Sequence, residues 1–198
     1  MTEDRLPLRI GVLAIQGDYA AHAEALADAG AFPVEVRKLE QLAGLHGLVL
    51  PGGESTTMLK FLEKHSFFDA LKEFCALHPV FGTCAGTILL AHEVVNPAQR
   101  SLDVLDATVE RNAYGRQIDS TILTAETDLP GGPLEMVFIR APRIVATGQA
   151  VEVLARREGY PVLVRQGGIM AATFHPELST DRRVHKAFVQ IVSDSVRG

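Results

Sequence analysis

The stretch PVFGTCAGTILL, residues 79–90, carries the clearest structural pattern in the chain. An apolar run ends at Cys84, a glycine stands two positions to either side of this cysteine, and apolar residues at helical spacing follow. A strand that turns sharply into a helix, with a nucleophile at the turn, has this G-x-nucleophile-x-G form. Gly82 and Gly86 suit such a bend because a side chain at either position would clash. The stretch therefore predicts a strand, a tight turn and a helix of an α/β sheet, with Cys84 at the carboxyl edge.

The first half of the chain repeats this alternation of strand and helix. Strands are predicted within residues 8–17, 33–38, 47–53 and 80–84, and helices over about 18–30, 55–78 and 85–93. Gly30 suits the end of the first helix, and Ser66 suits the N-cap of a second helix within the 55–78 stretch. The strands are apolar on both faces, which is typical of a parallel sheet covered by helices on both sides.

The second half has a different pattern. Residues 106–126 alternate polar and apolar with a turn at Tyr114 and Gly115, and residues 151–166 form two β runs joined by EGYP, so these segments look antiparallel. We also expect an irregular loop over 94–103, a strand within 168–177, and a closing amphipathic helix over 181–194 with Val184, Phe188, Ile191 and Val192 on one face.

Length and composition fit one compact domain over residues 1–198. The predicted fold class is α/β: a flavodoxin-like open mixed sheet, mostly parallel, flanked by helices, with an added antiparallel β portion in the second half. The formal charge of −5 and the scattered Lys and Arg residues argue against a nucleic-acid partner. No apolar run approaches the ~20 residues that span a bilayer, and the acidic start MTEDRLPLR is unlike a signal peptide. We therefore expect a cytoplasmic protein with no membrane partner.

The two cysteines, Cys75 and Cys84, form no CxxC or Cys/His cluster, which argues against a disulfide framework and a zinc site. Backbone N–H groups at the start of a helix favour a thiolate over a thiol, and they can also hold an oxyanion. Cys84 is thus a candidate nucleophile, and a small buried residue in a tight turn is the alternative. Cys75 lies on the apolar pattern of a helix and is interpreted as core.

A thiol nucleophile needs a base, and the base needs an orienting group. His175 ends an apolar strand, and Glu177 projects from the same face if the backbone is extended, as Pro176 favours. As a metal pair, these two residues lack a third ligand nearby; an edge-strand histidine beside an exposed glutamate is the alternative. Helices or connecting segments hold the other histidines, which we interpret as surface or internally satisfied residues: His22, His46, His65, His78, His92 and His185.

A glycine-rich loop, LPGGES at residues 50–55, follows another buried strand at the same predicted sheet edge. One of its backbone amides can complete an oxyanion hole for a reaction at Cys84. A phosphate-binding loop is the weaker interpretation, because the pattern G-x-x-x-x-G-K-[ST] is missing. The loop, the turn cysteine and the H-x-E pair each stand at a strand end, which favours one shared site.

Three motifs in this order, PGGES, GTCAG and FHPE, make the chain resemble the class I (triad) glutamine amidotransferases. It is similar in particular to the glutaminase subunits of pyridoxal 5′-phosphate synthases. That similarity is carried by AIQG (14–17), PGGESTTM (51–58), FGTCAG (81–86), VERNAYGRQIDS (109–120), FIRAP (138–142) and FHPEL (174–178). Ala14 and Thr87 depart from the family pattern outside the triad, and the 94–103 loop matches it poorly.

The resemblance implies an activity and a site. Cys84 is expected to attack the side-chain amide of L-glutamine, releasing ammonia and leaving a γ-glutamyl thioester, while His175 moves protons and Glu177 orients His175. The implied glutamine-binding residues are Gly53, Glu54, Ser55, Arg111, Ile139 and Arg140, and the implied oxyanion hole uses Gly53 and Ala85. A guanidinium suits the α-carboxylate of glutamine and an acceptor suits its α-ammonium. A surface salt bridge is the alternative role for the two arginines.

The resemblance also implies a partner, a separate (β/α)8-barrel synthase that joins the ammonia to a pentose phosphate and a triose phosphate. Pyridoxal 5′-phosphate is then the product of the partner, and we expect this chain to hold neither a cofactor nor a metal. The isolated glutaminase is expected to be weakly active until it docks.

Three other interpretations stay open. The chain could serve another triad amidotransferase, or it could be a flavodoxin-like cysteine hydrolase acting on peptides or small carbonyl compounds. A non-catalytic regulatory role is the third. An intact triad disfavours the last, because a degenerate member should have lost Cys84 or His175.

Overall fold

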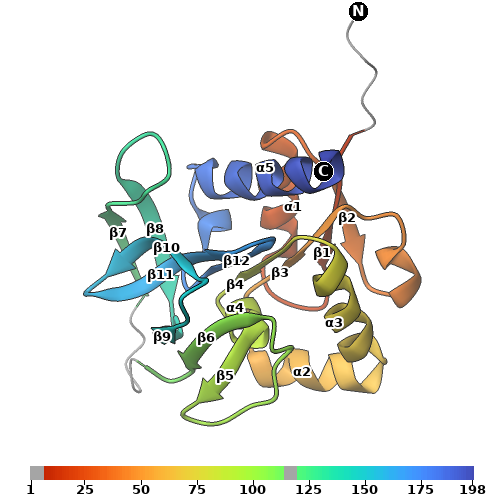
Figure 1. Ribbon diagram of the computed structural model, residues 1–198, viewed down its shortest axis with the longest axis horizontal. Helices are drawn as coiled ribbons and strands as arrows, with labels where there is room; N and C mark the ends of the chain where they lie inside the picture. Colours follow the sequence, from red (N-terminus) through yellow and green to blue (C-terminus); the bar gives the residue numbers. More distant parts are fainter. Residues whose placement is uncertain (1–6, 114–119) are drawn as a thin grey trace, which may run out of the picture.

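The computed structural model describes residues 7–113 and 120–198, and a seven-stranded sheet forms its centre (Figure 1). The strand order is β10-β11-β12-β4-β3-β1-β2. These strands are β1 (Arg9–Leu13), β2 (Phe32–Val36), β3 (Gly47–Leu50), β4 (Val80–Thr83), β10 (Glu152–Arg157), β11 (Tyr160–Gln166) and β12 (Ile169–Ala172). Neighbours from β2 to β12 are parallel, and β11 and β10 are added antiparallel. The order 2-1-3-4 is that of flavodoxin-like sheets, so the predicted fold class is confirmed.

Helices cover both faces of this sheet (Figure 1). One face carries α1 (Tyr19–Asp28) and α5 (Arg183–Arg197), and the other carries α2 (Ser55–Lys64), α3 (Phe67–Leu77) and the short α4 (Ala85–Leu90). Successive strand residues point to opposite faces. Phe81 therefore packs toward α5 while its neighbour Val80 joins the core of α2 and α3. The predicted apolar face of α5 is buried at Val184, Phe188, Ile191 and Val192.

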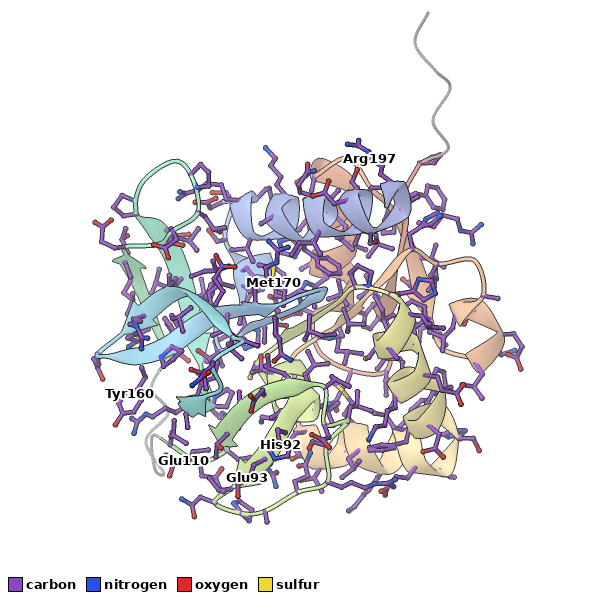
Figure 2. All side chains as sticks on the ribbon, in the orientation of Figure 1. His92, Glu93, Glu110, Tyr160, Met170 and Arg197 are labelled. Carbon is purple, nitrogen blue, oxygen red and sulfur yellow. The ribbon has the colours of Figure 1, made fainter. Side chains whose placement is uncertain are left out.

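Two smaller sheets make up the rest of the β structure in the described part of the chain. One joins β5 (Ala91–Val95), β6 (Leu105–Glu110) and β9 (Arg143–Thr147), and the other pairs β7 (Ser120–Ala125) with β8 (Leu134–Ile139). Figure 2 shows His92, Glu93 and Glu110 on the first of these sheets and Met170 between the central sheet and α5. The described residues also form two 3-10 turns, η1 (Leu39–Leu42) and η2 (Pro176–Leu178).

The helix predicted over 85–93 is too long, because α4 ends at Leu90 and β5 begins at the next residue. The backbone N–H of Leu102 donates to Leu89 O at 2.7 Å, and that of Val104 donates to Leu90 O at 3.1 Å. In a longer helix these two carbonyls would accept from residues 93 and 94. Tertiary hydrogen bonds therefore end the helix where the local pattern predicts that it continues, and the irregular loop begins only after Val95.

The alternating segment 106–126 does contain two strands, but they do not pair with each other. β6 pairs with β5 and β9, whereas β7 pairs with β8. The sequence did not predict β8 or β9, and the turn predicted at Tyr114 and Gly115 lies outside the described residues. β10 and β11 do form the antiparallel pair predicted for residues 151–166.

Ser66 occupies the N-cap position of α3 as predicted, but its side chain makes no capping hydrogen bond there. Its φ of 59° puts it in the left-handed region, where it serves as the turn between two helices. Glu54 instead caps α2, accepting from the backbone N–H groups of Thr56 and Thr57. Among residues 7–113 and 120–198, no helix has both the length and the apolar character that a membrane crossing requires. The single domain over 1–198 stays a prediction.

Candidate active site

Cys84 is the one residue between the end of β4 and the start of α4, so the stretch has the predicted strand, turn and helix. Its backbone adopts φ 48° and ψ −103°, a conformation that side chains rarely adopt and that is typical of functional sites. The backbone N–H of Cys84 donates to Ala172 O at 2.9 Å, which joins the turn to β12. The sulfur is thereby held at the carboxyl edge of the central sheet.

His175 and Glu177 meet directly. His175 Nδ1 lies 2.7 Å from Glu177 Oε1, and the side chain of Glu177 is fully buried. An ionised carboxylate only accepts hydrogen bonds, so Nδ1 carries the proton and donates it. Cys84 lies beside the same ring: both residues line one cavity, and Cys84 is close enough to raise the pKa of the imidazole. The structure therefore brings the three predicted catalytic residues into one connected group.

The backbone that joins this pair is not the extended strand that the sequence analysis expected. β12 ends at Ala172, and η2 follows at Pro176, closed by a hydrogen bond from Leu178 N to His175 O at 3.2 Å. Proline suits the first position of such a turn, because its missing N–H would have no intrahelical partner there. A tight turn, and not the alternation of a strand, directs the carboxylate back to the ring.

The electrostatic surroundings favour a charged His175. Burial by itself lowers the pKa of this imidazole, but the hydrogen bonds and charges of Cys84 and Glu177 outweigh burial and raise the pKa to about 10. At neutral pH the ring is therefore an imidazolium beside the sulfur. Cys75 differs, because burial raises the pKa of its thiol to about 12, which leaves it uncharged and unreactive.

A cavity of about 440 Å³ opens beside Cys84 and His175. All six residues predicted to bind glutamine line it: Gly53, Glu54, Ser55, Arg111, Ile139 and Arg140. Ala85, the second residue predicted for the oxyanion hole, follows Cys84 and is fully buried. The cavity volume is in the range of small-molecule sites.

Charged groups line one side of this cavity. Arg111 Nη2 donates to Thr56 Oγ1 at 2.8 Å and lies 3.6 Å from Glu54 Oε1. Partial burial by itself raises the pKa of Glu54. Hydrogen bonds from Thr56 and Thr57 outweigh burial and lower this pKa to about 2. Glu54 is thus an anion beside a guanidinium, and the cavity offers both signs of charge to a zwitterion.

Gly52 is a site residue that the sequence analysis did not single out. A Cβ built there would lie 2.6 Å from His175 Cε1 and 3.5 Å from Cys84 Cβ, so the imidazole packs directly on this glycine. The sequence signal was the Gly52 and Gly53 pair, which we interpreted as a source of free amides. The steric need for Gly52 follows only from the approach of a ring more than a hundred positions away in the chain.

Two histidines interpreted as surface or internally satisfied residues lie behind the triad. His22 on α1 and His185 on α5 are fully buried and contact each other, with 3.0 Å between His22 Nδ1 and His185 Nε2. His22 Nε2 lies 3.3 Å from Glu177 Oε2. Nothing in the local sequence around either histidine indicates this contact.

Comparison with known proteins gives the family. Residues 12–194 match the SNO glutamine amidotransferase family. The chain belongs to this family. A relative from Koribacter versatilis (strain Ellin345), described as "Pyridoxal 5'-phosphate synthase subunit PdxT", is 57% identical over 191 residues, covering 96% of this chain and 99% of the relative. A relative of the same description from Thermotoga neapolitana is 50% identical over 93% of this chain and 100% of its own length.

Solved structures agree with this placement in the SNO glutamine amidotransferase family. One titled "Crystal structure of glutamine amidotransferase" has a TM-score of 0.86 at 47% identity, covering 93% of this chain and 98% of its own. Another, titled "Structure of PurLQS from Thermotoga maritima", has a TM-score of 0.60 at 16% identity, covering 97% of this chain and 98% of its own, which shows the shared fold alone. The resemblance seen in the sequence motifs is confirmed at the level of family and fold.

Proposed function

We propose that this chain is the glutaminase subunit of a pyridoxal 5′-phosphate synthase. It hydrolyses L-glutamine to L-glutamate and ammonia and passes the ammonia to a synthase subunit. The observation that carries the proposal is the hydrogen-bonded pair of His175 and Glu177 beside Cys84 at the wall of a charged cavity. The names of the SNO family and of its PdxT relatives supply the substrate and the pathway.

The first half of the reaction forms a thioester. The Cys84 thiolate attacks the side-chain carbonyl carbon of glutamine, and the oxygen becomes an oxyanion held by the backbone N–H groups of Gly53 and Ala85. The carbon–nitrogen bond then breaks. His175 gives its Nε2 proton to the leaving nitrogen, which departs as ammonia, and Glu177 keeps the ring in the orientation that this transfer needs.

The second half releases the acid. His175, now neutral, accepts a proton from a water molecule, and the resulting hydroxide oxygen attacks the thioester carbon. The carbon–sulfur bond breaks, glutamate leaves, and the Cys84 thiolate and the His175 imidazolium are restored. Each turnover therefore consumes one glutamine and one water and yields one ammonia and one glutamic acid side chain, which releases a proton to become glutamate. These steps use no metal or cofactor.

Recognition of glutamine uses the two charged groups on its α-carbon, the carboxylate and the ammonium. Arg111 or Arg140 binds the α-carboxylate through a guanidinium fork, and Glu54 accepts from the α-ammonium. Gly53, Ser55 and Ile139 complete the walls of the cavity. These assignments transfer the family motif to the residues that surround the reactive sulfur.

The partner that we propose is a (β/α)8-barrel synthase, which makes pyridoxal 5′-phosphate as its own product. Ammonia released into neutral water is mostly protonated and is then no longer a nucleophile. Direct delivery to an acceptor enzyme keeps the ammonia unprotonated and able to react. Cys75 and Cys84 are both free thiols in the structure, which fits the reducing cytoplasm as the site of action.

The test of this function measures glutamate and ammonia formation by the purified chain with and without the barrel synthase. We expect weak activity alone, strong stimulation by the synthase, and incorporation of amide ¹⁵N from glutamine into pyridoxal 5′-phosphate. Glutamate release that the synthase neither stimulates nor consumes would point to another acceptor enzyme. A complete lack of glutamate release in the complex would remove the proposed function.

The raised pKa of His175 predicts the alkaline limit of the reaction. The imidazolium gives its proton to the leaving ammonia, so the rate should stay high until the pH nears about 10 and fall above it, as the ring loses that proton. Glu177→Gln removes a charge that favours the imidazolium, so the His175 pKa should fall toward its ordinary value of 6.5 and the limit should move to lower pH.

NMR titration of the His175 Cε1–H signal checks this shift without turnover. Glu63→Gln is the matched control, because Glu63 is an exposed carboxylate that pairs with Arg100 and does not line the cavity. The control should titrate as the wild type does. An unchanged His175 titration in Glu177→Gln would contradict the role given to the carboxylate.

Arg111→Ala is expected to raise the KM for glutamine by about 10- to 100-fold with little change in kcat. A hydrogen bond to a charged group contributes about 1.5–3 kcal/mol, and this one holds the substrate equally before and during the reaction. Steady-state kinetics in the complex measures both constants. Arg100→Ala, which removes an exposed arginine paired with Glu63, should leave KM unchanged. A normal KM for glutamine in Arg111→Ala would mean that Arg140, and not Arg111, binds the α-carboxylate of the substrate.

A further inference from the structure

Glu177 uses one carboxylate oxygen to orient His175, and its other oxygen lacks a well-aligned hydrogen-bond donor among the described residues. Oε1 accepts from His175 Nδ1 at 2.7 Å. Oε2 is buried and has no well-aligned hydrogen bond within the described part of the chain. A buried charged oxygen without a donor is strongly unfavourable, so a donor close to Oε2 has a large influence on the orientation of the carboxylate.

His22 brings a donor to this oxygen. Its ring is fully buried on α1, with Nε2 at 3.3 Å from Glu177 Oε2 and 3.1 Å from Thr83 Oγ1. A single N–H at Nε2 therefore faces both oxygens. A small rotation of the ring or of the carboxylate turns the longer contact into a hydrogen bond to Glu177.

His185 decides which nitrogen of His22 carries the proton. His185 Nε2 lies 3.0 Å from His22 Nδ1, and one of these two atoms must donate to the other. If His22 Nδ1 donated, its bare Nε2 lone pair would face a carboxylate, and His185 would bury an N–H at Nδ1, an atom with no partner among the described residues. If His185 Nε2–H donates, His22 Nε2–H points toward Glu177, and His185 Nδ1 buries a lone pair in place of an N–H.

Both rings are neutral in the folded protein. Burial, followed by the neighbouring His185 and His175, lowers the pKa of His22 well below its usual value. Burial, followed by Arg182, lowers the pKa of His185 to about 3. Each ring therefore has one N–H to place, as the tautomer argument requires. α1 and α5 lie side by side on one face of the sheet (Figure 1). The centroids of the two rings that they hold are 5.3 Å apart.

We propose that His22 is a positioning residue of the glutaminase site, holding the second carboxylate oxygen of Glu177 through Nε2–H, with His185 fixing the required tautomer. The inference rests on the proposed function, since it assumes that Glu177 orients His175 during glutamine hydrolysis. The connected series then runs from His185 through His22, Glu177 and His175 to Cys84. It extends the triad by two buried side chains on two helices.

Substitution of His22 tests the proposal in the complex with the synthase. His22→Leu keeps an apolar side chain of similar reach but removes the donor, and it should lower kcat about 10- to 100-fold with KM within about twofold of wild type. His22→Gln places an amide N–H near the position of Nε2 and should recover most of this loss. Phe188→Leu, which disturbs packing against Phe81 on the same face, is the control: it should lower stability but not kcat.

A double-mutant cycle separates positioning from general damage. With Glu177→Ala in place, adding His22→Leu should slow alkylation of Cys84 by iodoacetamide no further, because the carboxylate that His22 holds is gone. If the two substitutions act independently, or if His22→Leu alone keeps wild-type kcat, the proposal is wrong. Cys84→Ala in the kcat assay tests the proposed function itself. An inactive Cys84→Ala variant beside fully active His22 variants would therefore overturn this inference and leave the proposed function standing.

The wild-type protein also gives a direct reading if His22→Leu fails to fold. Long-range ¹H–¹⁵N correlation of the histidine rings reports which nitrogen is protonated. We expect His22 and His185 both as the Nε2–H tautomer, unprotonated at Nδ1, near neutral pH. A His22 ring protonated at Nδ1 would overturn the proposal.

Discussion

Cys84→Ala is expected to lower glutamate formation by the complex by on the order of 10⁴-fold or more. Without the sulfur no thioester can form, and in triad hydrolases removal of the nucleophile costs about as much as removal of the whole triad. The cavity and its charged wall stay in place, so the variant should still bind glutamine. Coupled detection of glutamate, with the synthase present at saturating concentration, gives the rate.

Cys75→Ala is the matched control for this change. Its thiol lies on α3, and burial raises its pKa to about 12, so the second cysteine should contribute nothing to catalysis. Acid-quenched wild-type enzyme should show a γ-glutamyl adduct on Cys84 by mass spectrometry, and the Cys84→Ala variant should show none. A variant that keeps more than a tenth of the wild-type rate would end the thioester mechanism.

The parts of this site that the sequence predicted depend on local patterns and on one topological rule. Gly82, Cys84 and Gly86 lie within five residues, so the turn they form can be recognised without the fold. The carboxyl ends of neighbouring parallel strands lie at one edge, and this rule brings the loop after β3, the turn after β4 and the H-x-E pair after β12 together. Sequence patterns and sheet topology together therefore located the cavity.

The parts that were missed depend on contacts between distant segments. α4 ends early because the backbone N–H groups of Leu102 and Val104 donate to the carbonyls of its last turn. β6 and β7 both alternate polar and apolar residues, but they do not pair with each other: β6 pairs with β9, and β7 pairs with β8. His22 and His185 lie 163 positions apart, and each stands on a helix as a residue type of intermediate burial, so its type alone does not indicate a buried position. Neither the hydrophobic period nor the motif spacing reports such tertiary neighbours.

Gly86→Ala is expected to damage the fold and the site together. A Cβ built on Gly86 lies 2.0 Å from Leu50 O and 2.9 Å from Leu50 C, far inside contact distance of a backbone that cannot swing away as a side chain can. Leu50 is the last residue of β3, directly before the glycine loop that lines the cavity. We expect the free energy of unfolding to fall by about 3 kcal/mol or more, since overpacking against backbone is at the upper end of such costs.

Gly168→Ala provides the comparison, because its Cβ would lie 3.4 Å from Pro79 Cα, an ordinary contact, and no positive φ is involved. That variant should stay within about 1 kcal/mol of wild type in urea unfolding. Since β3 leads straight into Gly52 and Gly53, any Gly86→Ala protein that folds should also have a displaced oxyanion loop and a reduced kcat. Wild-type stability in Gly86→Ala would mean that α4 and β3 lie farther apart than this structure places them, and the sharp turn at Cys84 would then need another explanation.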